Sequence, residues 1–293
     1  MPVIARVQVA GLSGRSDKSL ERLCVSPDGQ LTAFTLKGGA VAVVDNRTNR
    51  SCVEVKMNGT ARSIAFAPSP SSSSSSSPYL TTSGGDGDVY VWDIRYAARQ
   101  ALGGGGHRCV AKWANEGGMP TCGLAVSPAA AMFPSAAASG GSSSSGGGGS
   151  GGGSSSGGGM PWPLAVASES GVVNLYRGLT GGSAGGGGRG GGGGGGGVAP
   201  AAPLKSLMNL TTPVETLRFN HDGQLLAMAS RWAKNALRVV HLPSATVFAN
   251  WPTSKSPLNY VFSLDFSPSS GFLAVGNDKG RVLLYRLRHY SEI

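Results

Sequence analysis

One short pattern recurs along this chain and limits what it can fold into. Residues 83–95 read SGGDGDVYVWDIR, a glycine- and aspartate-rich turn followed by alternating β-branched and aromatic residues. Related copies begin at Gly39, Gly87, Gly171, Asn235 and Gly280. Glycine and asparagine are the residues that most readily adopt a left-handed turn. In the strand that follows, Val89 and Val91 face one side and Tyr90 and Trp92 the other, and because one hairpin cannot bury both faces the pattern predicts stacked units.

A second pattern precedes each copy. It is an apolar alternation that closes on a proline or asparagine turn and begins at Leu23, Ile64, Leu124, Leu217 and Leu264. Short apolar runs lie between the two patterns at 31–35, 164–167, 225–229 and 272–275, and others follow the second at 51–55, 107–113, 204–210 and 246–251. Each unit is therefore predicted to have four strands. The first strands at 23 and 64 are 41 residues apart and those at 217 and 264 are 47 apart, close to the about 40 to 45 residues of a propeller blade.

The acidic turn itself could suggest a binding site instead. Asp86, Asp88 and Asp93 lie close together, but a calcium loop needs oxygen ligands at alternate positions and a closing glutamate, and an apolar strand follows Asp88. A phosphate-binding loop needs a Gly-Lys-Ser/Thr sequence and a following helix, which are absent here. The stretch is interpreted as scaffold.

Low-complexity inserts follow a rule of placement. Serine- and glycine-rich runs at 69–78 and 129–160 fall between the first and second strands of a unit, and those at 103–106 and 181–202 between the third and fourth. These runs are predicted to be disordered because they offer almost no side chain to bury. In a propeller both kinds of connection open on the same face. The opposite face, here called the compact face, keeps short loops at 58–60, 84–88, 116–120, 231–235, 253–259 and 277–280, and is predicted to be a packed interface.

Charge and composition limit the classes of function that the chain can have. The net charge is +10, which favours an anionic partner such as nucleic acid, although no known RNA-binding motif is present. The cations predicted on the interaction face are Arg231, Lys234, Lys255 and Lys279. Four scattered cysteines and four scattered histidines form no metal-ligand or catalytic pattern, so no enzyme, cofactor or metal site is predicted. No membrane span or secretory signal is predicted either.

The turn-and-strand pattern resembles the WD-repeat signature. This resemblance implies an all-β propeller with about five four-stranded blades, at 19–57, 59–115, 121–210, 213–252 and 259–290. It also implies that Asp86 hydrogen-bonds within its blade and that Trp92 packs between sheets. The structural positions of the motif are Asp86, Gly87, Trp92, Asp93, Gly171, Tyr176, Gly280 and Tyr285.

Several longer segments resemble one particular family of proteins. The segments 241–252 (HLPSATVFANWP), 266–293, 107–118 and 170–176 resemble the U3 small nucleolar RNA-associated protein 18 family of small-subunit processome components. The resemblance implies a non-enzymatic nucleolar scaffold that acts in ribosome biogenesis and small-subunit (18S) rRNA maturation. The implied partners are other WD-repeat processome proteins, the U3 ribonucleoprotein and pre-rRNA, with direct RNA contact left open.

The family's propeller has seven blades, so about two leading blades and an N-terminal extension are expected to be missing here. Residues 4–10 resemble a lone fourth strand, and the last blade lacks one after Tyr290. These ends favour an incomplete arc over a ring of five. One alternative stays open: Trp92 to Arg95 fits the WDxR ending of substrate receptors of cullin-RING ubiquitin ligases.

Overall fold

The computed structural model describes residues 20–68, 79–94, 108–117, 120–128, 162–178, 202–253 and 255–290. The predicted inserts at 69–78, 103–106 and 129–160, and all but the last residue of that at 181–202, lie outside the described residues. The strand expected at 4–10 and Arg95 also lie outside them.

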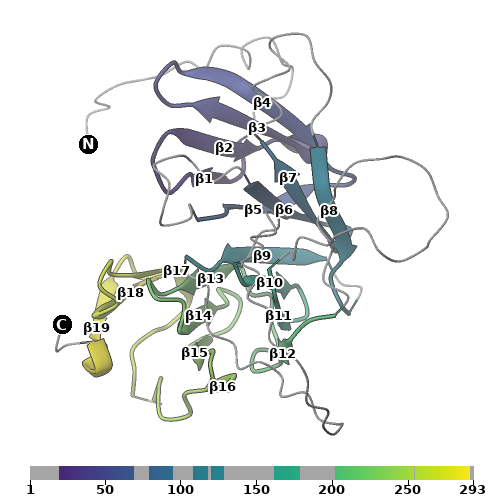
Figure 1. Cartoon of the computed structure of the whole chain (residues 1–293). Helices are drawn as coiled ribbons and strands as arrows, with labels where there is room; N and C mark the ends of the chain where they lie inside the picture. The colour runs from purple at the N-terminus through teal and green to yellow at the C-terminus, as the bar shows by residue number, and fades with distance from the viewer. Residues whose placement is uncertain are drawn as a thin grey trace, which may run out of the picture.

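The described residues form five antiparallel sheets, numbered 1 to 5 along the chain, whose strands are hydrogen-bonded in sequence order (Figure 1). Sheet 1 contains β1 (Leu23–Val25), β2 (Leu31–Thr35), β3 (Ala40–Asp45) and β4 (Arg50–Lys56), with the short 3-10 helix η1 (Lys37–Gly39) before β3; sheet 2 contains β5 (Ala61–Phe66), β6 (Tyr79–Gly84), β7 (Asp88–Asp93) and β8 (Arg108–Ala114); sheet 3 contains β9 (Thr121–Val126), β10 (Leu164–Ser168), β11 (Val173–Tyr176) and β12 (Lys205–Leu207). Sheet 4 contains β13 (Thr216–Phe219), β14 (Leu225–Ala229), β15 (Leu237–His241) and β16 (Thr246–Val247), and sheet 5 contains β17 (Val261–Phe266), β18 (Phe272–Asn277) and β19 (Val282–Arg286), followed by η2 (Arg288–Tyr290). The predicted all-β class is confirmed.

The recurring turn works as the sequence indicates. Gly87, Gly171 and Gly280 have φ angles of 81°, 89° and 67°, and Asn235 has 57°. These left-handed values let the second strand of each sheet reverse into the third within a few residues.

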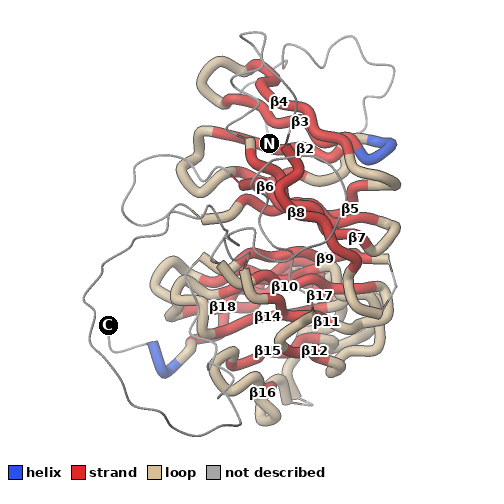
Figure 2. Tube along the Cα trace, turned by 45° about the vertical axis from the view of Figure 1, so that its right-hand side comes forward, coloured by secondary structure: helices blue, strands red, loops and turns tan. Residues whose placement is uncertain are grey.

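Side-chain alternation decides how the sheets stack. In β7, Tyr90 and Trp92 join the cluster shared with sheet 1, whereas Val89 joins the cluster shared with sheet 3. The same rule holds in β11, where Tyr176 faces sheet 2 and Leu175 faces sheet 4. The third strands β7 and β11 therefore each have one face toward the preceding sheet and one toward the following sheet. Figure 2 shows sheet 2 lying between sheets 1 and 3.

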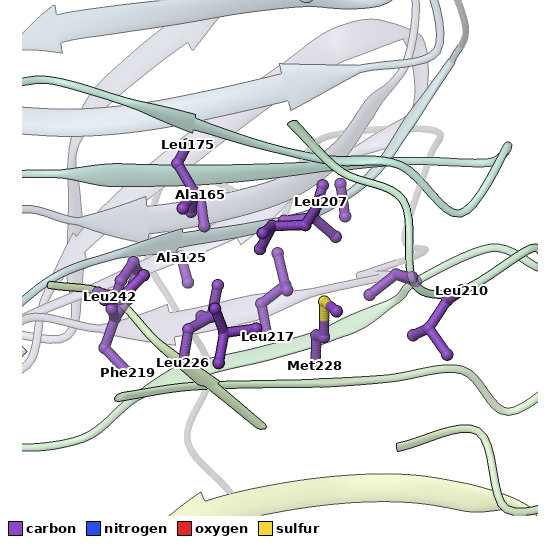
Figure 3. Close-up of a cluster of buried hydrophobic side chains, with 14 of the residues drawn as sticks. Ala125, Ala165, Leu175, Leu207, Leu210, Leu217, Phe219, Leu226, Met228 and Leu242 are labelled. Carbon is purple, nitrogen blue, oxygen red and sulfur yellow. The ribbon is translucent and has the colours of Figure 1, made fainter. Parts of the chain in front are cut away.

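The largest core lies between sheets 3 and 4 (Figure 3). Leu175, Ala165 and Leu207 approach it from sheet 3, and Leu217, Leu226 and Met228 from sheet 4. All six are at most 3 % exposed. A core this well filled fixes the angle between the two sheets, because interior side chains tolerate little displacement.

The stack ends with an open face. Val282 and Leu284 of β19, which point away from sheet 4, are 74 % and 64 % exposed, and Phe272 beside them is 41 % exposed. No described sheet covers this side of sheet 5. Among the described sheets the stack thus ends at sheet 5, and the incomplete arc stays a prediction.

The fourth strands of sheets 3 and 4 are shorter than predicted, whereas β4 and β8 agree with the predicted runs at 51–55 and 107–113. The run at 204–210 pairs only over β12, and that at 246–251 only over β16. Trp251 is followed by Pro252, which has no N–H to donate to a ladder. Leu210 turns inward instead and is 7 % exposed within the core of sheets 3 and 4. Apolar character in these runs reflects inward packing rather than strand pairing.

The connections divide between two edges of the sheets. The segments 67–78 and 127–163 join the first and second strands of sheets 2 and 3, and the segments 94–107 and 177–204 join their third and fourth strands. In an antiparallel sheet these connections open at the same edge. The short loops of the compact face join second to third strands and one sheet to the next, at the other edge.

Candidate interaction surface

Trp92 belongs to the scaffold. It is 6 % exposed, its Nε1 donates a hydrogen bond to Thr82 Oγ1 at 3.0 Å, and its ring stacks on Tyr90 with centroids 5.5 Å apart. Asp93, the next residue, is 4 % exposed. Both side chains are enclosed between strands and are unavailable to a partner.

Asp86 differs from the expectation. It is exposed at the tip of the turn between β6 and β7, and none of the described residues forms a hydrogen bond with it. Its carboxylate lies beside Gly59 of the preceding connection, where an added Cβ would meet Asp86 Oδ2 at 2.3 Å. The interpretation of Asp86 as a hydrogen-bonded structural acid is wrong, because the turn is already held by the Gly87 N to Gly84 O bond of 3.1 Å.

Tyr176 and Tyr285 occupy the same motif position with different surroundings. The Tyr176 hydroxyl donates to Asn115 Oδ1 at 2.9 Å and accepts from Glu116 N at 3.0 Å, which ties sheet 3 to the end of β8. Tyr285 packs its ring edge-on against Trp251 at 4.8 Å. Burial raises the pKa of both phenols. Both are structural.

Three loops of the compact face meet around one cavity of about 350 Å³. Lys234 comes from the β14–β15 loop, Lys255 from the connection between sheets 4 and 5, and Lys279 from the β18–β19 loop. Arg281, which directly precedes β19, is the fourth cation that lines it. The sequence indicated three of these four for the face. Arg281 is not among the cations predicted for this face, although it directly follows Gly280 of the recurring turn.

Reciprocal hydrogen bonds hold the three loops together. Asn235 N donates to Asn259 O at 2.8 Å, and Asn259 N donates back to Asn235 Oδ1 at 3.0 Å. Asp278 N donates to Tyr260 O at 3.0 Å, and Tyr260 N donates to Asp278 Oδ1 at 3.3 Å. The cavity is therefore a built feature of the fold, with its walls fixed by backbone groups.

Asn277 forms the floor of this arrangement. Its Oδ1 accepts hydrogen bonds from the backbone N–H groups of Lys279 and Arg281, both at 3.1 Å, which fixes the orientation of the amide. Its Nδ2 is buried without a hydrogen-bond partner in the structure, and the residue is 8 % exposed. Asn277 thus lines the cavity and carries an unused buried donor.

Arg231 lies outside the cavity. Its Nε and Nη2 approach the carboxylate oxygens of Glu215 at 2.6 and 3.1 Å, and its guanidinium lies over the Trp232 ring at 5.3 Å from the centroid. The charge that was predicted for the interaction face is thereby partly neutralised. Trp232 itself is 60 % exposed.

The other side chains that could bind a metal form no cluster among the described residues. Among the described residues, no three His, Cys, Asp or Glu side chains are grouped so that they could hold a metal ion. Burial raises the pKa of Cys122 to about 12. A separate, mainly apolar cavity of about 490 Å³ lies between sheet 4 and η2 and is lined by His241, Phe248 and Trp251 among others. None of the described helices is long and apolar enough to cross a membrane.

The chain resembles known proteins both in sequence and in fold. The family model for the WD domain, G-beta repeat, matches residues 58–93, which contain Gly87 and Trp92. These residues therefore match one WD repeat. The crystal structure of the mitotic checkpoint complex contains a chain with a similar fold, with a TM-score of 0.61 and 13 % identity over 94 % of the present chain and 65 % of that one.

Curated relatives share one description. The chain is 35 % identical to the U3 small nucleolar RNA-associated protein 18 homolog of Arabidopsis thaliana over 97 % of its own length, and 32 % identical to that of Mus musculus over 98 %. It is 49 % identical to U3 small nucleolar RNA-associated protein 18 of Saccharomyces cerevisiae over 43 % of its length. It spans 40 % and 41 % of the plant and mouse proteins. The predicted resemblance to this family is confirmed.

Proposed function

We propose that this chain is a non-catalytic scaffold subunit of the small-subunit processome that acts in ribosome biogenesis and pre-rRNA processing toward 18S rRNA, in the nucleolus. Similarity to the named relatives over 97 % of the chain carries the proposal. Its expected partners are other WD-repeat processome proteins, the U3 ribonucleoprotein and pre-rRNA. The blades at 19–57, 59–115, 121–210, 213–252 and 259–290 are proposed as its structural units.

The fold supports a scaffold role on physical grounds. Stacked four-stranded sheets with filled cores present their loops at fixed positions, which suits the simultaneous binding of several partners. Function in such a fold depends on surface sites rather than on the sheets themselves. We propose the compact face as the protein-binding side, because its loops are short apart from the connection at 248–260, while the other edge carries the three longest connections, at 94–107, 127–163 and 177–204.

Sedimentation tests the assignment. The tagged chain should migrate from cell extract in large particles together with U3 RNA, and ribonuclease should shift it to small particles. Slow migration with a cullin adaptor and no U3 RNA would contradict the proposal. Because the chain spans about two fifths of its relatives, the full-length homologue of the same cells serves as the positive control.

Photo-cross-linking tests the proposed face. A photoreactive residue at Asn58, exposed in a compact-face loop, is compared with one at Arg47, exposed in the β3–β4 turn of the other edge. Cross-links to WD-repeat processome proteins are expected from position 58 and not from 47. The reverse pattern would place the partner on the insert-bearing edge and refute the proposed face.

A further inference from the structure

The cavity between sheets 4 and 5 concentrates positive charge without the usual compensation. Lys234, Lys255, Lys279 and Arg281 line it, and none of the described residues around it is acidic. None of the four forms an ion pair with a described residue. The nearest acid in sequence, Asp278, has one oxygen engaged by Tyr260 N. Four cations brought together in this way repel one another until an anion neutralises them.

The unpaired amide of Asn277 points to the same ligand chemistry. Flipping the amide would place its NH₂ group against the N–H groups of Lys279 and Arg281, so Nδ2 must be the atom left without a partner. A buried donor without an acceptor is costly, and such groups in folded proteins normally have a partner. An anionic oxygen in the cavity would accept from Nδ2 and from the cations at once.

The site is organised before any ligand arrives. The Asn235–Asn259 and Tyr260–Asp278 bonds join the three loops that supply the cations. Little conformational entropy is therefore lost when an anion bridges them, apart from that of the long side chains themselves.

Two exposed aromatic rings distinguish RNA from other anions. Trp232, two residues before Lys234, is 60 % exposed, and Tyr260, next to Asn259, is 40 % exposed. Trp232 is held at its edge by a hydrogen bond from Nε1 to Glu215 Oε1 of 3.3 Å, and the Arg231 guanidinium lies over its ring, so stacking would use the other face. Cationic grooves beside exposed rings bind single-stranded nucleic acid by pairing with phosphates while bases stack on the rings. A free phosphate has no base to stack on the rings, so the rings favour RNA over it.

We propose that the Lys234–Lys255–Lys279–Arg281 cavity binds backbone phosphates of single-stranded RNA, with Asn277 Nδ2 as a phosphate donor and Trp232 and Tyr260 as base-stacking surfaces. The choice of RNA as the physiological polyanion rests on the proposed function. The cavity's preference for phosphate follows from its own charges and donors.

Direct binding by the purified full chain tests this inference. The probe is a fluorescein-labelled single-stranded RNA of about 15 nucleotides, measured by anisotropy between about 50 and 200 mM KCl. Lys255→Gln with Lys279→Gln should weaken binding about tenfold or more and reduce the slope of log Kd against log salt by about 1.4, since each lost phosphate contact removes about 0.7.

A charge-matched control separates the cavity from the overall charge of +10. Arg50→Gln with Lys205→Gln removes two exposed cations from strand starts at the other edge. This pair should leave affinity and slope unchanged within about twofold. Equal weakening by both pairs would show diffuse electrostatic binding and overturn the inference.

Two single variants address the donor and the rings. Asn277→Asp keeps the Oδ1 acceptor of the turn but replaces the donor with a negative charge, so it should bind RNA more weakly than the parent. Trp232→Ala should weaken RNA binding about fivefold with no change in salt slope. A far-ultraviolet circular dichroism melt confirms that each variant is folded. Unchanged affinity of folded Asn277→Asp would overturn the assignment of the site.

Competition identifies the class of ligand. Unlabelled single-stranded RNA should displace the probe, whereas inorganic phosphate and a phosphopeptide of equal charge should not do so at the same phosphate concentration. Preferential displacement by the phosphopeptide would make the cavity a protein site and refute the RNA assignment. Failure of U3 RNA to co-sediment affects the proposed function alone, because the anisotropy experiment uses only the purified chain and RNA.

Discussion

Sheets 2 and 5 are built from the same motif but differ in what covers them. Val89 in β7 and Val282 in β19 both follow the turn glycine by two residues, yet they are 0 % and 74 % exposed. Val91 and Leu284, two positions further, are 0 % and 64 % exposed. The difference teaches that the motif fixes which face a side chain points to, whereas the next sheet in the stack decides whether that face is core or surface.

Glycine substitution should give the largest contrast between a covered and an uncovered turn. A Cβ at Gly171 would meet the Leu210 carbonyl oxygen at 2.4 Å, whereas one at Gly280 would meet nothing within 4 Å. Gly171→Ala should lower the free energy of unfolding by about 3 kcal/mol, from left-handed strain and the backbone clash together. Gly280→Ala should lower it by about 1 kcal/mol. Urea denaturation measures both losses, and equal losses would contradict the expected difference between a covered and an uncovered turn.

Valine truncation tests the same idea on the strand faces. Val89→Ala should lower the free energy of unfolding by about 2 kcal/mol, because two buried methyl groups are lost from the cluster with Leu124 and Leu164. Val282→Ala should change it by less than about 0.5 kcal/mol. Urea midpoints at constant slope provide the measurement. A large loss at Val282 would mean that the forward face of sheet 5 is covered in solution.

Hydroxyl removal gives the smallest contrast and isolates one polar network. Tyr176→Phe should cost about 1 to 2 kcal/mol, because Glu116 N loses its acceptor and Asn115 Oδ1 loses a donor. Tyr285→Phe should be nearly neutral, since its hydroxyl forms no hydrogen bond with the described residues. Thermal melts followed by circular dichroism are sensitive enough to compare them. A neutral Tyr176→Phe would show that the network between sheets 2 and 3 adds no stability.

The strands and turns could be predicted from the sequence because both depend on local properties. Alternation marks the faces of β7 and β11, and left-handed residues mark the turns at Gly87 and Asn235. Pairing of the fourth strands could not be predicted, since inward packing of Leu210 and the proline at 252 compete with the ladder.

The candidate site was only partly visible in the sequence. The placement of Lys234, Lys255 and Lys279 on short loops follows from the order of strands. Their convergence, the contribution of Arg281 and the unpaired Nδ2 of Asn277 depend on how sheets 4 and 5 pack, which no local pattern encodes. Asp86 shows the opposite error, because a residue type that is usual at a motif position was assigned a contact that this chain does not make.

The one-sided packing of sheet 5 has a thermodynamic consequence. In a stack whose units are stabilised by their neighbours, a terminal unit with one neighbour opens at lower free energy than an internal one. Among the described sheets, sheet 5 rests on sheet 4 and leaves its forward face bare, so it should open at lower free energy than sheets 2 to 4. The loops with Lys279 and Arg281 would separate from those with Lys234 and Lys255 in that event. An anion that bridges them would act as a clamp on this terminal unit of the stack.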